Sequence, residues 1–317
     1  MKNKVLLVGT GQHALEYAKV LRFLEQDFDI IGNSRETCEK VSKELDVISM
    51  FGGVERNKES IIRNDYSCFI NSSPAESLAL STQRLTSLGL KKGLIEKPAI
   101  LDESDIEIYN LIQDRSKLFV GYNRRFYGST RKVMKMIEED GGITSFNFDF
   151  SEWPSRVENK ESLSNRERSR WFFYNSTHVI DLAFYICGRP STLYASSSGE
   201  NKIKWHPSSS KWSGSGISCN DITFSYRSDW VGPSRWTIEI FTKNRKIVMC
   251  PIEEVKTFDC RSMTFSNVEL ERSDHFKPGL LDQTSSFLSN DHSSIKTLND
   301  QISDYNDIFL KIFRGEA

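Results

Sequence analysis

Short apolar runs alternate with amphipathic segments along the first 120 residues of the chain. The run Val5–Val8 has no polar interruption, which is typical of a strand covered on both faces of a parallel sheet. A glycine-rich turn and a helical pattern over 12–25 follow it. The same order recurs and predicts further strands at 28–31, 68–70, 93–95 and 118–120, with helices at 36–44, 76–88 and 104–114. Such alternation predicts right-handed β-α-β crossovers and a doubly wound parallel sheet of the Rossmann type.

After Tyr122 the apolar positions alternate with polar ones instead of running together. Phe146, Phe148 and Phe150 fall on one face of the segment 145–150, which predicts a half-exposed strand. Segment 221–226 alternates in the same way, 236–242 and 246–250 predict a hairpin, and the serine- and glycine-rich stretches 196–199 and 208–216 are interpreted as loops. We therefore expect an α/β chain of two domains, a Rossmann domain at 1–122 and an α+β domain with a largely antiparallel sheet at 123–317.

Composition and charge narrow the class of protein. The 317 residues are 38% hydrophobic and 27% charged, and 42 basic residues nearly balance 43 acidic ones, so nucleic acid and membrane are not expected as partners. No stretch approaches the roughly 18 apolar residues of a spanning helix, and Val5–Val8 is too short for a signal peptide, which predicts a cytoplasmic protein. Six scattered cysteines without a C-x-x-C pair predict neither a metal site nor a disulfide framework.

The first candidate site is the sequence GTGQHA at 9–14, which fits G-x-G-x-x-A between a strand and a helix. Gly9 would permit the tight turn, Gly11 would let the backbone approach a pyrophosphate, and Ala14 would let the helix pack on the strand. Free N–H groups at the helix start would meet the anion. This context predicts dinucleotide binding, with an ordinary pair of loop glycines as the alternative.

The end of the second strand bears on which dinucleotide binds. An acidic residue there would bond a ribose 2′-hydroxyl, but no carboxylate lies between Ile31 and Arg35. Ser34 and Arg35 supply a hydroxyl and a guanidinium suited to a 2′-phosphate, so NADP(H) is favoured over NAD(H). The alternative is an exposed arginine that merely begins the next helix.

Glu96, Lys97 and Pro98 stand at the end of a predicted buried strand, where ligands of open α/β sheets bind. The Lys97 ammonium could orient a substrate hydroxyl and share in proton transfer if its pKa is depressed. A solvated loop lysine is the alternative on composition alone.

Four motifs together resemble one family. GTGQHA at 9–14, EKP at 96–98, GYNRRF at 121–126 and THVID at 177–181 are similar, in order and spacing, to the glucose-fructose oxidoreductase, inositol dehydrogenase and rhizopine-catabolism (Gfo/Idh/MocA) family. The resemblance implies a Rossmann domain plus an open-faced sheet domain for substrate binding and oligomerisation. It also implies an NAD(P) cofactor and hydride transfer at a sugar or cyclitol hydroxyl.

The same resemblance implies the site residues. It gives Lys97 and His178 as catalytic residues and a cis bond between Lys97 and Pro98. The implied cofactor-binding residues are Gly9, Thr10, Gly11, Gln12, His13, Ser34, Arg35, Ser72, Pro74, Glu96, Lys97 and Asn123. The implied substrate-binding residues are Lys97, Tyr122, Arg124, Tyr174, Asn175 and His178. A homodimer or homotetramer formed through the sheet of the second domain is also expected.

One position departs from the family pattern. The family commonly has D-x-G-x-H before this helix, whereas the chain reads YNSTH at 174–178, so both the acid and the glycine are missing. Tyr174 or Asn175 could still bond a sugar, and His178 could instead pack at the helix start with Asp181 as its partner. The charged run 156–170 is usual for a solvated helix face, although Arg166, Arg168 or Arg170 could reach a nucleotide-sugar diphosphate.

Three functions fit these observations. The first is an NADP(H)-dependent oxidoreductase acting on a sugar or nucleotide sugar. The segments 175–182 and 228–236 look more like relatives in bacterial surface-glycan biosynthesis than like inositol dehydrogenases. The second is a non-catalytic, dinucleotide-sensing regulator of the same fold, favoured by the missing D-x-G-x-H pattern and disfavoured by the retained EKP. The third is a lyase or hydrolase that uses tightly bound NAD transiently, against which Arg35 argues.

Overall fold

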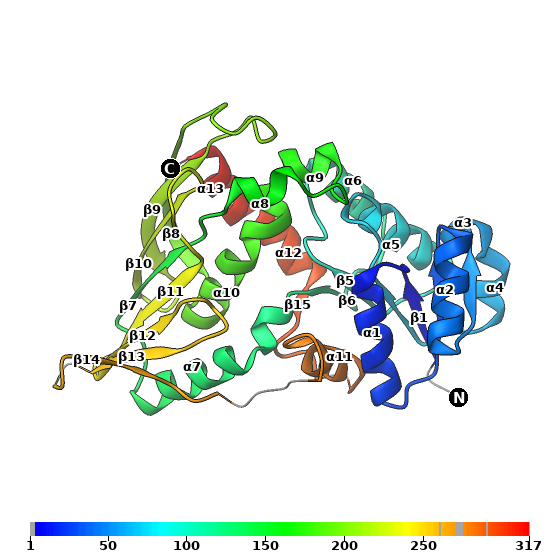
Figure 1. Cartoon of the computed structure of the whole chain (residues 1–317), viewed down its shortest axis with the longest axis horizontal. Helices are drawn as coiled ribbons and strands as arrows, with labels where there is room; N and C mark the ends of the chain where they lie inside the picture. Colours follow the sequence, from blue (N-terminus) through cyan, green and yellow to red (C-terminus); the bar gives the residue numbers. More distant parts are fainter. Residues whose placement is uncertain (1–3, 260, 271–274, 290, 317) are drawn as a thin grey trace. The chain divides into compact units, whose positions relative to one another are not determined.

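The computed structural model describes residues 4–259, 261–270, 275–289 and 291–316, which form two compact units (Figure 1). The first unit contains residues up to Asn123 and the segment 275–302, and the second contains the other described residues. The expected boundary after Tyr122 is one residue from this division. We expected 275–302 in the second domain, but it returns to the first because its strand β15 (Lys296–Thr297) pairs with β6 (Leu118–Gly121).

The sheet of the first unit has the strand order β15-β6-β5-β4-β1-β2-β3. Its remaining strands are β1 (Val5–Val8), β2 (Phe28–Gly32), β3 (Ser49–Phe51), β4 (Cys68–Asn71) and β5 (Gly93–Glu96). All pair in parallel except the edge strand β15. The predicted doubly wound Rossmann sheet is confirmed, and the carboxyl ends of its parallel strands lie along one edge.

Helices of the first unit fall close to the predicted positions. They are α1 (Gln12–Phe23), α2 (Arg35–Leu45), α3 (Gly53–Arg56), α4 (Lys58–Arg63), α5 (Leu78–Ser87), α6 (Glu103–Asn110), α11 (Leu280–Ser289) and the start of α12 (Leu298–Asp304), with a 3₁₀ turn at Ala75–Ser77. The last residues of α12, including Asp304, belong to the second unit, as does most of the 3₁₀ turn at Asn123–Phe126. Helix α1 buries Ala14, Tyr17 and Leu21, and α11 packs against it. Within the described part of the chain, no helix is long and apolar enough to cross a membrane.

The sheet of the second unit has eight strands in the order β14-β13-β12-β11-β7-β10-β9-β8. Their bounds are β7 (Ser145–Asp149), β8 (Pro190–Ser198), β9 (Lys211–Ser218), β10 (Thr223–Asp229), β11 (Thr237–Phe241), β12 (Arg245–Met249), β13 (Lys256–Asp259) and β14 (Thr264–Asn267). Among the described residues of this sheet, only the β7–β10 pair is parallel, which confirms the largely antiparallel sheet. Phe146, Phe148 and Phe150 are at most 2% exposed, as their alternation predicts.

The interpretation of 196–199 and 208–216 as loops is wrong for most of these residues. Most of them belong to β8 and β9, which pair in antiparallel with a register shift between Pro190 and Thr192. A Cβ at Gly214 would lie 2.2 Å from the Tyr194 carbonyl oxygen and 2.3 Å from the Tyr226 hydroxyl. The glycine therefore gives room for the Tyr226 ring to lie across the neighbouring strand, and small residues here serve packing rather than a turn.

The described helices of this unit are α7 (Gly128–Glu139), α8 (Pro154–Glu158), α9 (Asn165–Ser169), α10 (Thr177–Cys187) and α13 (Leu310–Arg314), with π-helical turns at Phe172–Ser176 and Tyr305–Phe309. Two of these helices pack on the sheet. Helix α10 packs on β7 and β11, and α13 packs on β8 and β9 (Figure 1).

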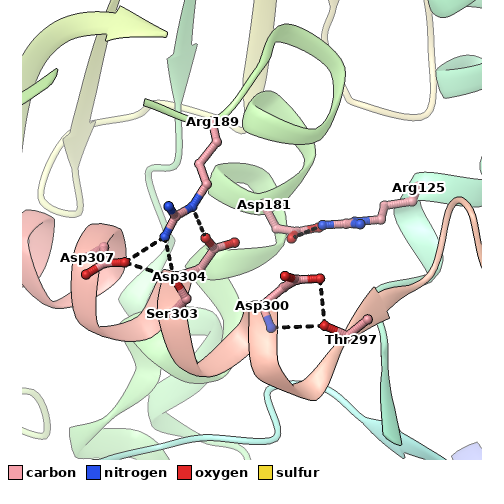
Figure 2. A network of polar contacts seen from close by, with 8 residues as sticks. All are labelled: Arg125, Asp181, Arg189, Thr297, Asp300, Ser303, Asp304 and Asp307. Carbon is pink, nitrogen blue, oxygen red and sulfur yellow. Dashed lines mark hydrogen bonds and ion pairs between the residues drawn. The ribbon is translucent and has the colours of Figure 1, made fainter. Parts of the chain in front are cut away.

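Arginine–aspartate contacts fix the helices of this unit. Arg189 donates to Asp304, at 2.6 Å, and to Asp307, at 2.8 Å, from the residue that precedes β8 (Figure 2). Arg125 donates to both oxygens of Asp181 on α10, at 2.7 and 2.8 Å (Figure 2). Such paired contacts fix the orientation of the groups as well as adding energy.

Candidate functional site: a dinucleotide edge and a tryptophan-lined cavity

The glycine-rich turn between β1 and α1 has the geometry of an anion site. Gly9 has a φ of +123°, and a Cβ there would lie 2.5 Å from the Ser72 carbonyl oxygen. A Cβ at Gly11, in contrast, would meet no protein atom within 4 Å. Gln12 then begins a 12-residue helix that has no side-chain cap and no acidic residue in its first turn. The open backbone and the helix N–H groups therefore fit a pyrophosphate.

Two arginines lie in the helices that follow β2 and β3, in the region where the adenosine ribose of a dinucleotide would bind. Ser34 is the N-cap residue of α2, and the next residue, Arg35, has its guanidinium carbon 4.6 Å from the centre of the Phe51 ring. The guanidinium carbon of Arg56 lies 4.4 Å from the same ring. Both guanidinium groups therefore contact the Phe51 ring at the end of β3, and guanidinium groups are suited to bind a phosphate. The sequence reasoning missed Arg56 because 20 residues separate it from Arg35 and only the β2–β3 pairing brings the two together.

Other expected cofactor residues lie along the same sheet edge. The Ser72 N–H donates to the Val8 carbonyl at 2.7 Å, and Pro74 precedes the 3₁₀ turn that follows. The Thr10 and Thr37 hydroxyls lie 2.8 Å apart, whereas the Gln12 side chain bonds Glu16 within α1. Asn123 donates to the Pro278 carbonyl at 3.0 Å and is 5% exposed.

Glu96, at the end of β5, is a buried carboxylate with three neighbours. His13 Nε2 lies 2.9 Å from its Oε1, and the Tyr17 hydroxyl donates to the same oxygen at 2.5 Å. Gln283 on α11 donates to the Tyr17 hydroxyl at 2.8 Å. Burial alone would raise the pKa of Glu96, but His13 and Tyr17 hold it below its ordinary value. Glu96 and His13, both expected at the cofactor, thus also bind each other and join α1 to the strand end.

Lys97 follows Glu96 directly and is half-buried at the carboxyl end of β5. The Lys97–Pro98 bond is cis, as the resemblance implies. Gln301 donates to the Pro98 carbonyl, at 2.9 Å, and to the Tyr122 hydroxyl, at 3.2 Å. Tyr122, which was expected to bind substrate, is 1% exposed. Through Gln301, its hydroxyl is connected to the backbone of the EKP turn.

The second unit contains a cavity of about 370 Å³ at the carboxyl end of β7. Three tryptophans, Trp153, Trp171 and Trp236, line it, and so do the carboxyl group of Glu152 and the amide of Asn175. Further lining comes from three basic and several other residues: Arg156, Lys160, Arg235, Ser151, Val157, Ser234, Pro251, Ile252 and Glu253. Aromatic walls with a few convergent polar groups are typical of a small-molecule site.

Glu152 is the polar centre of this cavity and is 7% exposed. Asn175 Nδ2 lies 3.0 Å from both of its carboxyl oxygens, and the Ser176 hydroxyl donates to Oε1 at 2.9 Å. Burial raises the pKa of Glu152 to about 7, and hydrogen bonds from Trp171, Ser176 and Asn175 together with the nearby Arg124 only partly oppose this. A carboxyl group with such a pKa can accept or release a proton near neutral pH. Sequence reasoning missed it because no local spacing relates Glu152 to Asn175.

Four expected substrate residues come together around this cavity. Asn175 lines it, and Tyr174 stacks on Trp171 with ring centroids 5.0 Å apart. The guanidinium carbon of Arg124 lies 5.0 Å from the Trp236 ring centre, and the His178 ring lies 6.2 Å from it.

The charged run 156–170 contributes different residues from those named in advance. Arg156 and Lys160 line the cavity, whereas Arg166, Arg168 and Arg170 do not. Arg168 instead donates to the Lys160 carbonyl. Among the described residues, no three His, Cys, Asp or Glu side chains are placed to hold a metal ion.

Comparison with known proteins supports the fold at low sequence identity. No protein-family model matches this sequence, and no match was found among curated proteins. Over its whole length the chain is similar to the solved UDP-N-acetylglucosamine 3-dehydrogenase from Acidithiobacillus ferrooxidans, with 13% identity, 98% of that chain covered and a TM-score of 0.71. Levoglucosan dehydrogenase, in complex with NADH and levoglucosan, matches 99% of this chain and 98% of its own, with 17% identity and a TM-score of 0.74.

A third solved structure, myo-inositol 2-dehydrogenase from Lactobacillus plantarum, covers 99% of this chain and 97% of its own, with 16% identity and a TM-score of 0.73. The chain therefore shares its fold with these three solved dehydrogenases, a Rossmann sheet followed by a largely antiparallel sheet, as the resemblance of the sequence motifs implies.

The first prediction concerns the pH dependence of stability. Because the folded-state pKa of Glu152 lies above its unfolded value, the folded protein binds more protons between about pH 4.5 and 7. The contribution of Glu152 to stability is therefore largest at low pH and is lost as the pH rises toward 7. Glu152→Gln should remove this loss, so that the variant gains on the order of 3 kcal/mol relative to wild type between pH 4.5 and 8. Urea unfolding at several pH values measures the difference.

Glu253→Gln is the matched control, since Glu253 lines the same cavity but is exposed. It should not reproduce the pH-dependent gain, because the Glu253 side chain is exposed whereas that of Glu152 is buried. Parallel curves for wild type and Glu152→Gln would contradict the assignment of the raised pKa to Glu152.

Proposed function

We propose that the chain is an NADP(H)-dependent oxidoreductase that transfers a hydride to or from a carbon of a carbohydrate. The observation that carries this proposal is the arrangement along one sheet edge. The open glycine turn after β1, the paired arginines beside β2 and Lys97 after β5 all stand at carboxyl ends of the same parallel sheet. That edge is where nucleotides bind in doubly wound folds.

The cofactor preference rests on charge. A 2′-phosphate would meet the guanidinium groups of Arg35 and Arg56 and the Ser34 hydroxyl, and no carboxylate stands between Ile31 and Arg35. The fold neighbours include proteins solved with NADH and with NAD⁺ and one named as NADPH-dependent, so the proposed preference for NADP(H) rests on the residues of this turn alone.

The chemistry would divide between cofactor and protein. A bound nicotinamide supplies the hydride exchange at carbon. Lys97 would orient the reacting hydroxyl, and its Nζ atom would accept or return the proton of that hydroxyl. The lysine is suited to this because it stands at the carboxyl end of β5, on the same sheet edge as the glycine-rich turn. His178, at the start of α10 and against Trp236, would contribute chiefly to substrate binding.

The substrate class is a sugar or nucleotide sugar. The cavity of the second unit supports this class, because tryptophan faces and carboxyl or amide groups suit the C–H faces and hydroxyls of a sugar ring. Two of the fold neighbours are named as dehydrogenases of UDP-N-acetylglucosamine and of levoglucosan.

A dinucleotide-sensing regulator is the second candidate, and Tyr174 is the observation that favours it. Tyr174 occupies the position of the usual acid and stacks on Trp171. It therefore supplies an aromatic ring where the family has a carboxylate.

The second prediction concerns the cofactor. NADPH should bind wild type more tightly than NADH, and Arg35→Ala or Arg56→Ala should each weaken NADPH by about 10-fold or more, since each removes a charge-assisted contact to the 2′-phosphate. NADH affinity should change little in both variants. Calorimetric titration with both dinucleotides measures this. Equal or tighter NADH binding by wild type would contradict the interpretation of the turn.

The third prediction concerns catalysis. Lys97→Met should lower the turnover number by about 100- to 10,000-fold, as removal of a general acid or base usually does. NADPH affinity should stay within a few-fold, and His178→Ala should act mainly on the Michaelis constant. Steady-state kinetics on an identified carbohydrate provide the measurement. Near wild-type turnover by Lys97→Met would exclude the proposed role, and wild type that binds NADPH but turns over no carbohydrate would favour the regulator.

The fourth prediction concerns assembly, for which the outer face of the sheet is the proposed interface. The paired positions Ser215, Ser225 and Asn147 form a row of small polar residues across β9, β10 and β7, beside the exposed Tyr194. Light scattering at micromolar concentration should give a dimer or tetramer. Ser225→Arg should weaken it by placing a bulky charge on the flat face, whereas Lys132→Arg on α7 should not. A monomeric wild type would contradict the proposal.

A further inference from the structure

The three tryptophans of the second-unit cavity are held in fixed orientations. The Trp153 indole N–H donates to the Ser234 carbonyl at 2.6 Å, and Trp171 stacks on Tyr174 with an interplanar angle of 20°. The Arg124 guanidinium covers Trp236. Indole rings that other side chains already orient lose little conformational entropy when a flat apolar ligand face packs on them.

Below the tryptophans, Glu152 and Asn175 keep acceptor capacity for a ligand. A carboxylate has about four lone-pair sites, and three side chains donate to Glu152: the Asn175 amide, the Ser176 hydroxyl and the Trp171 indole. Asn175 uses its Nδ2 atom in these contacts, so its Oδ1 atom is a further acceptor. Hydroxyl groups of a sugar ring are donors of the kind that such a floor would bind.

The rim of the cavity is positively charged. Arg156, Lys160 and Arg235 are exposed lining residues, against one exposed lining carboxylate, Glu253. The Arg156 guanidinium carbon lies 4.3 Å from the Trp153 ring centre, and Lys160 Nζ lies 5.6 Å from that of Trp171. A substituent on a ring that packs against these tryptophans would therefore meet cations.

The volume limits what the cavity can hold. About 370 Å³ is near the lower end of the roughly 300–1,000 Å³ of small-molecule pockets. It suits one sugar ring with its substituent at the rim, and a nucleotide attached to that substituent would extend outside.

We infer that this cavity binds the sugar ring of a phosphorylated sugar, with the ring between the tryptophans, its hydroxyls on Glu152 and Asn175, and its phosphate at Arg156, Lys160 and Arg235. The inference rests on the proposed function only for the class of ligand, a carbohydrate. It deepens that proposal by adding the phosphate and by assigning Glu152, which stands in for the acid missing at position 174.

The experiment is a calorimetric titration of the full chain with UDP-N-acetylglucosamine, UDP and N-acetylglucosamine. A saturating concentration of NADP⁺ is present throughout, to keep the probes from the dinucleotide site. The variants are Glu152→Gln and the double variant Arg156→Gln/Arg235→Gln. Lys132→Gln/Lys135→Gln is the matched control, because it removes the same charge from exposed residues of α7 that do not line the cavity. Circular dichroism checks that each variant is folded.

The nucleotide sugar should bind wild type at least 10-fold more tightly than N-acetylglucosamine. The double arginine variant should weaken both UDP and UDP-N-acetylglucosamine by about 10-fold or more, as expected for lost charge-assisted contacts, and the control should not. Glu152→Gln should weaken the nucleotide sugar but leave UDP unchanged, because only the sugar ring reaches the floor.

Three results would overturn the inference: no binding of either UDP compound at millimolar concentration, equal binding in the double arginine variant, or equal sugar discrimination in Glu152→Gln. None of these readouts requires hydride transfer. Binding with the expected pattern but without turnover would therefore reject the proposed catalytic function and keep the site.

Discussion

In each unit of the protein, one of the buried carboxyl groups lies at or shortly after the end of a strand, and burial of a carboxylate is unfavourable unless partners supply charge or hydrogen bonds. In the first unit this group is Glu96, which immediately precedes Lys97. Its partners are His13 and Tyr17 on α1, and Gln283 on α11 extends the network through Tyr17. The requirement to satisfy Glu96 therefore links the glycine turn, the EKP turn and the returning C-terminal segment within one unit.

The second carboxyl group, Glu152, has a different set of neighbours and therefore different chemistry. Asn175 and Ser176 donate neutral hydrogen bonds to it, whereas Glu96 has His13 beside it, and burial raises the pKa of Glu152 to about 7. Glu96 is thus suited to remain ionised and to hold structure. Glu152 is suited to change its protonation state at a cavity that a ligand can enter.

Much of the fold could be predicted from the sequence because burial on both faces leaves continuous apolar runs such as Val5–Val8, and half-burial leaves the alternation of Phe146, Phe148 and Phe150. Strands β8 and β9 were missed because they are rich in serine and glycine, which is typical of loops. Their small residues instead leave room for aromatic rings of the neighbouring strand, as Gly214 does for Tyr226. The residues of the candidate site likewise fall into those that the sequence could predict and those that it could not. Residues in local motifs, such as Gly9 and Lys97, could be found, but Arg56 and Glu152 depend on pairings between distant segments that leave no local pattern.

Isotope transfer from the cofactor tests the central claim, hydride exchange between NADP(H) and a carbohydrate carbon, most directly. Wild-type protein would be incubated with NADPH carrying deuterium at C4 and with a mixture of keto-sugars and nucleotide keto-sugars, with Lys97→Met as the control, and the products analysed by mass spectrometry. The account predicts one carbohydrate that gains a single non-exchangeable deuterium with wild type and not with the variant. Binding of the labelled NADPH without deuterium in any carbohydrate would contradict it.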